Sequence, residues 1–138
     1  MRVFLDANIV FSAAKSDGAV RALVKLLFER GHECWVDEYV IAEARRNLTF
    51  KGPDSLDALD GILAQLQVGA AKAPAGPVAQ VAWLPEKDRP VLLSAMRFRC
   101  QVLVTGDRAH FGAGYGKVFD GVAIHSPRSL AEMVLADE

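Results

Sequence analysis

Two aspartates follow apolar runs in a pattern that could place both carboxylates at one binding site. Asp6 comes directly after residues 3–5, Val-Phe-Leu, and Asp107 comes shortly after the mostly apolar residues 101–104. A near-continuous apolar run is typical of a strand buried on both faces of a parallel sheet. Such sheets bind ligands just beyond the carboxyl ends of their strands. If the two strands are neighbours, about 5 Å apart, Asp6 and Asp107 face the same crevice.

This predicted crevice would favour a divalent cation. Like charges at short range raise each other's pKa unless a cation lies between them. Asp88 would add a third carboxylate from the start of a helix, and Glu43 a fourth from the middle of another. Oxygen ligands without cysteine or histidine select hard ions, so the expected cofactor is Mg²⁺ or Mn²⁺.

The segments that must position these acids have the pattern of strands alternating with helices. Strands are expected at residues 2–5, 34–36, 101–104 and 122–124, with a short edge strand near 67–71. Helices are expected at residues 8–14, 20–30, 38–48, 55–66, 88–98 and 126–135. This alternation predicts an α/β fold with a parallel sheet and right-handed crossovers. No internal repeat or long linker divides the chain, so one domain over residues 1–138 is expected.

The helix that carries Glu43 has a cap and an apolar stripe. Asp37 can cap the start of this helix. The predicted stripe is Ile41, Ala44 and Leu48. Glu43 points away from this stripe, towards solvent or a cleft.

Asp88 is placed to cap its own helix, and Pro90 suits the first turn of that helix. The expected buried face consists of Val91, Leu92, Ala95 and Met96. Asp88 could therefore cap the helix and bind a metal at once.

Composition fits a globular protein and excludes several other classes. The 138 residues are 51% hydrophobic, and 16 basic residues nearly balance 17 acidic ones. The chain has no basic tail of the kind that would indicate a nucleic-acid binder. A metal site can nevertheless supply local positive charge. Cys34 and Cys100 are isolated among apolar residues, which indicates buried free thiols. No apolar run approaches the ~20 residues of a membrane span and no signal peptide is recognised, so a cytoplasmic protein is expected.

The four acids and their neighbours resemble the PIN-domain family of metal-dependent ribonucleases. The matching pieces are Val-Phe-Leu-Asp6-Ala-Asn8 with Ser12, Val-Ile-Ala-Glu43-Ala-Arg-Arg-Asn-Leu, Lys-Asp88-Arg-Pro-Val-Leu-Leu-Ser-Ala and Leu-Val-Thr105-Gly-Asp107. They cover almost the whole chain, and the layout resembles the VapC-like toxins of bacterial toxin–antitoxin pairs. The resemblance implies a three-layer α/β/α PIN-like fold, a parallel sheet of order 3-2-1-4-5 and an acidic pocket at its carboxyl edge.

The resemblance also implies roles for seven residues. The catalytic and metal-binding positions match Asp6, Glu43, Asp88 and Asp107, and the supporting polar positions match Asn8, Ser12 and Thr105. Asp6 and Asp107 would bind Mg²⁺ or Mn²⁺ directly. Glu43 or Asp88 would hold water molecules or act as general base. The implied partners are an RNA substrate and an antitoxin protein, with a homodimer as a further option and no membrane.

The expected function is a metal-dependent endoribonuclease that hydrolyses RNA phosphodiester bonds, with two alternatives. One is a non-catalytic RNA- or protein-binding module of the same fold, which intact acids at all four positions disfavour. The other is phosphotransfer on a related sheet, but a phosphatase of the haloacid-dehalogenase type needs an aspartate where Asn8 stands. The segment Arg108-Ala109-His110-Phe111 follows the last acid, where some family members carry a further acid, and His110 is interpreted as a loop residue rather than a catalyst.

Overall fold

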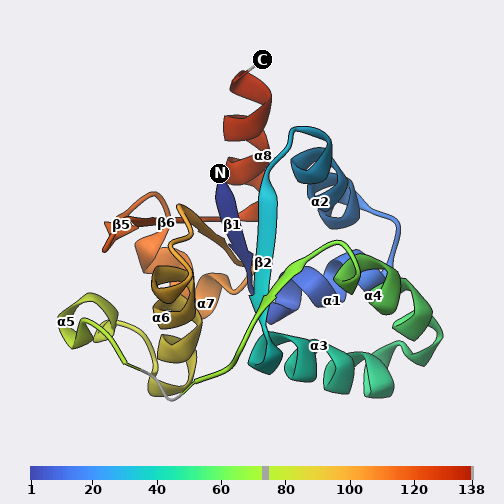
Figure 1. The fold of residues 1–138 in the computed structure, drawn as a ribbon, viewed down its shortest axis with the longest axis horizontal. Helices are drawn as coiled ribbons and strands as arrows, with labels where there is room; N and C mark the ends of the chain where they lie inside the picture. Colours follow the sequence, from blue (N-terminus) through green and yellow to red (C-terminus); the bar gives the residue numbers. More distant parts are fainter. Residues whose placement is uncertain (73–74, 138) are drawn as a thin grey trace.

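A six-stranded sheet of order β3-β2-β1-β4-β6-β5 runs through the middle of the protein (Figure 1). The computed structural model describes residues 1–72 and 75–137. The strands are β1 (Arg2–Leu5), β2 (Glu33–Asp37), β3 (Gln67–Gly69), β4 (Val102–Val104), β5 (Val118–Phe119) and β6 (Val122–His125). Strands β3, β2, β1, β4 and β6 pair in parallel in that order. The predicted order 3-2-1-4-5 is confirmed, with β6 in the fifth place.

The sheet differs from the prediction by one edge strand. β5 pairs with β6 in the antiparallel sense, so the sheet is mixed rather than fully parallel. Asp120 and Gly121 join the two strands with φ values of 47° and 84°. Two central residues with positive φ make the tight hairpin turn that Asp-Gly pairs favour. This Asp-Gly pair is the sequence signal for the extra strand.

Helices cover both faces of the sheet and give the expected three-layer α/β/α arrangement. They are α1 (Ala7–Lys15), α2 (Ala19–Glu29), α3 (Glu38–Lys51), α4 (Leu56–Leu63), α5 (Val78–Val81), α6 (Arg89–Arg97), α7 (Arg108–Phe111) and α8 (Pro127–Ala136). Figure 1 shows α6 on one side of β1 and β2, and α1, α2 and α4 on the other. Within the described part of the chain, none of the helices has both the length and the apolar character that a membrane span requires.

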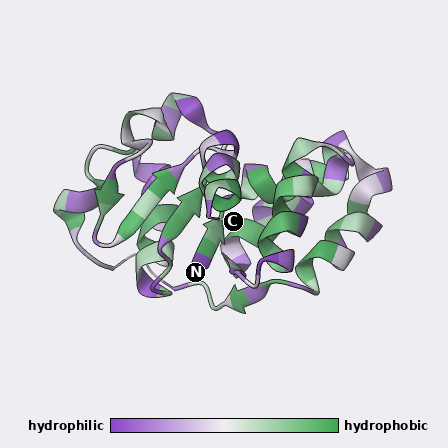
Figure 2. Ribbon diagram, turned by 90° about the horizontal axis from the view of Figure 1, so that it is seen from above, coloured by the Kyte–Doolittle hydropathy of each residue, from purple (hydrophilic) through white to green (hydrophobic). Residues whose placement is uncertain are grey.

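The strands supply much of the hydrophobic core, and they are hydrophobic along most of their length in Figure 2. Phe4, Leu103 and Ile124 are fully buried, as the apolar runs predict. Cys34 and Cys100 are buried free thiols, and burial raises the pKa of each to about 12. Thiols with such a pKa stay protonated and weakly reactive near neutral pH, so both cysteines have a packing role.

The register of β1 against β4 determines where the two aspartates lie. Phe4 pairs with Leu103 and Leu5 pairs with Val104, so both strands end at the same level. The Asp6 backbone N–H then donates a hydrogen bond to the Val104 carbonyl at 3.1 Å. The residues that follow each strand are therefore held side by side at the carboxyl edge of the sheet.

Helix α3 starts where the sequence predicts it. The Asp37 carboxylate accepts hydrogen bonds from the Val40 N–H and from the Ser94 hydroxyl of α6, each at 2.8 Å. The buried residues of α3 are Val40, Ala44 and Leu48. Ile41 is only half-buried, because the buried positions of α3 recur every four residues from Val40 and the helix packs chiefly against α1. On α6, Met96 is only half-buried, although the sequence predicts that it is buried. Ser94 is buried instead, and its hydroxyl donates a hydrogen bond to the Asp37 carboxylate.

Two glycines give opposite predictions for substitution by alanine. A methyl group on Gly69 in β3 would overlap the ring of Phe98, which stacks against Phe4 and Trp35. Gly69→Ala should lower the free energy of unfolding by about 1–3 kcal/mol through overpacking. A methyl group on Gly61 in α4 would meet no neighbouring atom within 4 Å, so Gly61→Ala should raise it by about 1 kcal/mol.

Urea unfolding followed by circular dichroism measures both changes in one experiment. A Gly69→Ala protein as stable as the wild type would contradict the packing of Phe98 against β3.

Candidate active site

Asp6, Glu43, Asp88 and Asp107 line a single pocket of about 300 Å³. Asp6 follows β1, and Asp107 follows β4. Glu43 lies in the middle of α3, and Asp88 directly precedes α6. Side chains far apart in the sequence therefore converge at the carboxyl edge of the sheet, while their catalytic and metal-binding roles stay predictions.

Asp6 is the most buried of these acids, with 6% of its surface exposed. Its Oδ2 accepts hydrogen bonds from the Thr105 hydroxyl at 2.8 Å and from the Asn8 amide at 3.1 Å. Its Oδ1 accepts one from the Ala7 N–H at 2.8 Å, at the start of α1. A carboxylate can accept about four hydrogen bonds, so three donors hold Asp6 in place and leave room for one further contact.

The same hydrogen bonds join the end of β1 to the loop after β4. The Asn8 side-chain oxygen accepts from the Gly106 N–H at 2.8 Å, and the Thr105 hydroxyl accepts from the Asp107 N–H at 3.1 Å. Thr105 is fully buried, and its carbonyl accepts a hydrogen bond from the Tyr115 hydroxyl at 2.8 Å. Asn8 and Thr105 thus make the kind of contacts that supporting residues require.

Burial makes the Asp6 carboxylate costly to ionise. The pKa of Asp6 is raised to about 6, chiefly by burial, with a smaller contribution from the negative charge of Glu43. Hydrogen bonds from Thr105, Ala7 and Asn8 lower the pKa and only partly offset burial. Loss of hydration is thus a larger cause of the shift than the repulsion between carboxylates that the sequence predicts.

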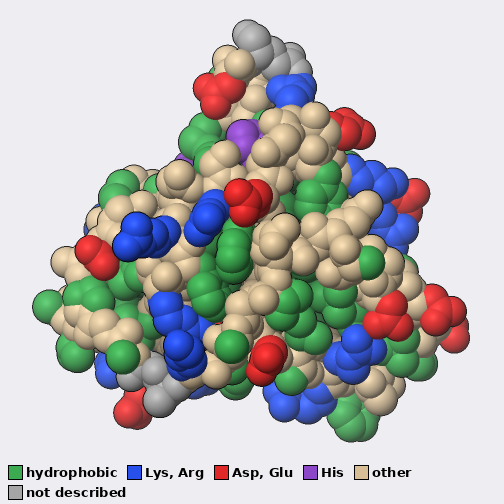
Figure 3. All heavy atoms as spheres, in the orientation of Figure 1, with side chains coloured by type: hydrophobic (Ala, Val, Ile, Leu, Met, Phe, Trp, Pro, Cys, Tyr) green, Lys and Arg blue, Asp and Glu red, His purple; other side chains and the backbone are tan. Residues whose placement is uncertain are grey.

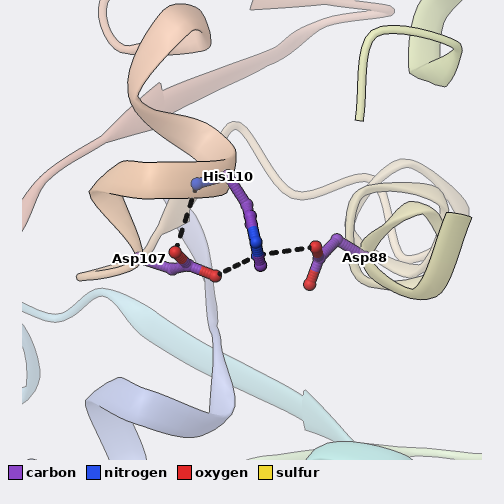
Figure 4. Close-up of side chains that lie close together, drawn as sticks. All are labelled: Asp88, Asp107 and His110. Carbon is purple, nitrogen blue, oxygen red and sulfur yellow. Dashed lines mark hydrogen bonds and ion pairs between the residues drawn. The ribbon is translucent and has the colours of Figure 1, made fainter. Parts of the chain in front are cut away.

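Asp88, Asp107 and His110 form a compact group of possible metal ligands within the described residues (Figure 4). His110 Nδ1 lies 2.9 Å from Asp107 Oδ2 and 3.0 Å from Asp88 Oδ2. One possible ligand atom from each of the three side chains lies within 4.8 Å of the other two. Asp6, which the sequence pairs with Asp107 as a direct ligand, is not a member of this group.

Asp88 does not cap α6 as the sequence predicts. Its side chain makes no capping hydrogen bond and reaches His110 instead. Asp88 has φ −95° and ψ −14° and closes the 3-10 helix Glu86–Asp88, whereas a capping residue normally has an extended backbone. Its carboxylate is therefore available to the pocket.

His110 lies in the short helix α7 rather than in a loop. The Asp107 Oδ1 accepts a hydrogen bond from the His110 N–H at 3.2 Å and so caps this helix. The cap holds the imidazole beside the Asp107 carboxylate and close to Asp88. The Asp-x-x-His spacing is the available sequence signal, because residues i and i+3 lie on one side of a helical turn.

One face of α3 also lines the pocket. Tyr39, Glu43, Asn47 and Lys51 follow one another at intervals of four residues, and all of them are pocket residues. This spacing places them on the same side of a helix, although the sequence argument names only Glu43 among them as a site residue. Lys87 lines the pocket as well, and the ion pairs of the described residues involve neither Lys51 nor Lys87.

Ser12 is placed differently from the other predicted residues. It lies on α1, one turn beyond Asn8, but it is not among the residues that line the pocket. Phe11, its neighbour in the chain, lines the pocket instead. The supporting role of Ser12 therefore stays a prediction.

An α/β sheet with an acidic pocket beyond its central strands defines a class of proteins that bind ligands at a topological switch point. The sequence model described as PIN domain matches residues 2–109, so this chain belongs to the PIN domain family. A search of curated proteins finds no match.

A solved structure supports the fold. The chain is similar to one in the crystal structure of VapBC2 from Rickettsia felis bound to a DNA fragment from their promoter, with a TM-score of 0.67 and 17% sequence identity. The similarity covers 91% of this chain and 98% of that one.

The raised pKa of Asp6 predicts how the stability of the metal-free protein depends on pH. The folded-state pKa is about 6, above the unfolded value of about 3.9, so the folded state binds more protons between these values. Stability should fall as pH rises through this window, by at most about 3 kcal/mol from Asp6. Asp6→Asn removes the titration, so its melting temperature relative to wild type should increase from pH 4.5 to pH 7.5.

Thermal unfolding in EDTA at several pH values measures this difference. Asp57→Asn, at an exposed position on α4, is the control and should show no such trend. A difference in melting temperature between Asp6→Asn and the wild type that stays constant with pH would show that burial does not raise the pKa of Asp6.

Proposed function

We propose that this protein is a Mg²⁺- or Mn²⁺-dependent endoribonuclease that hydrolyses RNA phosphodiester bonds and acts as the toxin of a toxin–antitoxin pair. One observation carries the proposal: Asp6, Glu43, Asp88 and Asp107 come from four separate elements and line one pocket. Membership of the PIN domain family supports the same reading. The proposal treats residues 1–138 as one nuclease domain.

The pocket residues fit a divalent cation. The Asp88 Oδ2 atom is shielded from solvent and has no hydrogen-bond partner among the described residues, so it is an acceptor that a cation would satisfy. Asp88 and Asp107 would hold the ion, and Asp6 has one acceptor position left to contribute. A bound divalent cation supplies Lewis-acid polarisation of the phosphodiester and makes water more acidic.

The chain's own residues would position the reacting groups and move the proton. Glu43 lines the pocket from α3 and is half-buried, and its carboxylate would take a proton from the attacking water. Asn8 and Thr105 would keep the Asp6 carboxylate in one orientation through their hydrogen bonds. The Asn8 amide nitrogen donates a hydrogen bond to Asp6, and its oxygen accepts one from the Gly106 N–H. Both groups are thus engaged in holding the site, and an amide does not act as the general acid that phosphotransfer would need.

The substrate would be held by residues around the acids rather than by a broad basic surface. Figure 3 shows acidic and basic side chains interspersed over one face of the molecule. Within the pocket, Lys51 and Lys87 would contact RNA phosphates next to the cleaved bond. Tyr39 is 49% exposed, and its ring would stack on an unpaired base.

An antitoxin protein is the proposed partner. The support is the likeness of the fold to a chain of the VapBC2 structure, whose title describes a complex bound to promoter DNA. A toxin that cleaves RNA would act in the cytoplasm. The antitoxin would have to prevent cleavage until it is removed.

Cleavage of RNA by the wild-type protein should require Mn²⁺ or Mg²⁺ and stop with EDTA. Asp107→Asn should lower kcat/KM at least about 100-fold, because it removes a metal-binding carboxylate. Asp57→Asn is the matched control on an exposed helix and should cleave like the wild type. Cleavage that persists in EDTA or in Asp107→Asn would refute the proposed mechanism, and RNA binding without metal-dependent cleavage would favour the non-catalytic alternative.

Lys51→Gln and Lys87→Gln should each weaken RNA binding in the inactive Asp107→Asn background. Each lost phosphate contact should also reduce the slope of log affinity against log salt by about 0.7 for single-stranded RNA. Fluorescence anisotropy across a salt series measures both quantities. Lys25→Gln, an exposed residue of α2 outside the pocket, is the control, and an equal loss in this variant would show that the pocket lysines have no special part.

A further inference from the structure

The imidazole of His110 lies between the carboxylates of two pocket residues, Asp88 and Asp107. Its Nδ1 is 2.9 Å from Asp107 Oδ2 and 3.0 Å from Asp88 Oδ2 (Figure 4). Figure 4 shows the ring between the two acids, which approach it from opposite sides. The Asp107 carboxylate caps α7 by accepting a hydrogen bond from the His110 N–H, and this holds the backbone from which the imidazole extends.

Both short contacts are at ion-pair distance, but neither has the geometry of a hydrogen bond. His110 Nδ1 and Asp88 Oδ2 are both shielded from solvent, and neither has a hydrogen-bond partner among the described residues. Buried polar atoms are normally paired, because leaving one unpaired costs free energy. Two such atoms facing each other, with a second carboxylate beside them, are an arrangement that a shared cation would satisfy.

The separations also agree with a coordination sphere. Ligands at about 2.1 Å from a metal in octahedral geometry are about 3.0 Å apart when they are adjacent. The distances from His110 Nδ1 to Asp107 Oδ2 and Asp88 Oδ2 have this value without any movement of the side chains. His110 Nδ1 thus has the spacing of an adjacent ligand to each of the two carboxylate oxygens before a metal binds.

We propose that His110 is a direct metal ligand, that it completes a nitrogen–oxygen–oxygen donor set with Asp88 and Asp107, and that this set makes the site prefer Mn²⁺ to Mg²⁺. The inference rests on the proposed metal-dependent function. Mg²⁺ binds almost entirely to oxygen, whereas imidazole nitrogen suits transition metals. A sequence argument from carboxylates alone predicts no preference between the two ions.

Pulsed electron paramagnetic resonance of Mn²⁺ bound to the untagged full-length protein tests this ligand directly. The wild type should show magnetic coupling of Mn²⁺ to an imidazole ¹⁴N nucleus. His110→Asn should lose this coupling, and His32→Asn should keep it, because His32 contacts the N-terminus and does not belong to the group of Asp88, Asp107 and His110. Titration calorimetry with each ion alone should show Mn²⁺ affinity falling at least about tenfold in His110→Asn, with a smaller change for Mg²⁺.

The possible results separate this inference from the proposed function. Mn²⁺ binding without ¹⁴N coupling, or equal losses for Mn²⁺ and Mg²⁺ in His110→Asn, would overturn the role of His110 and leave the metal-dependent nuclease intact. Absence of any Mn²⁺ binding to the wild type would overturn both. Circular dichroism of His110→Asn confirms that a lost signal does not come from an unfolded protein.

Discussion

The buried carboxylate of Asp6 is the interaction on which the rest of the site depends. It lies where β1 and β4 end together, and it accepts hydrogen bonds from both segments, through Asn8 on one side and Thr105 on the other. These bonds satisfy a charged group that burial would otherwise make very costly. They also fix the loop that carries Asp107, because the Asp107 N–H donates to Thr105. The geometry of the pocket thus follows from the register of two parallel strands.

Much of this arrangement can be predicted from the sequence, because it depends on local and periodic features. Apolar runs identify β1 and β4, and parallel pairing then requires the residues after them, including Asp6 and Asp107, to share one edge. The helical pattern likewise places Glu43 off the apolar stripe of α3. The strand order depended instead on the family resemblance, since periodicity alone does not determine which strands are neighbours.

The features that could not be predicted depend on contacts between distant segments or on backbone detail. His110 contacts Asp88 only because the start of α7 lies close to the 3-10 helix that precedes α6, and no local pattern encodes this contact. Asp88 has the residue type of a helix cap, but its backbone belongs to the preceding 3-10 helix, so the carboxylate turns elsewhere. By contrast, the β5–β6 hairpin has a local signal in Asp120 and Gly121, and turn chemistry could have revealed it.

The central claim is that the four acids form a pocket for a divalent cation, and anomalous diffraction from crystals grown with Mn²⁺ tests it most directly. The account predicts that the strongest manganese peak lies between Asp88 and Asp107, within reach of Asp6. A map with no peak in this pocket, at an Mn²⁺ concentration that supports RNA cleavage, would contradict the account.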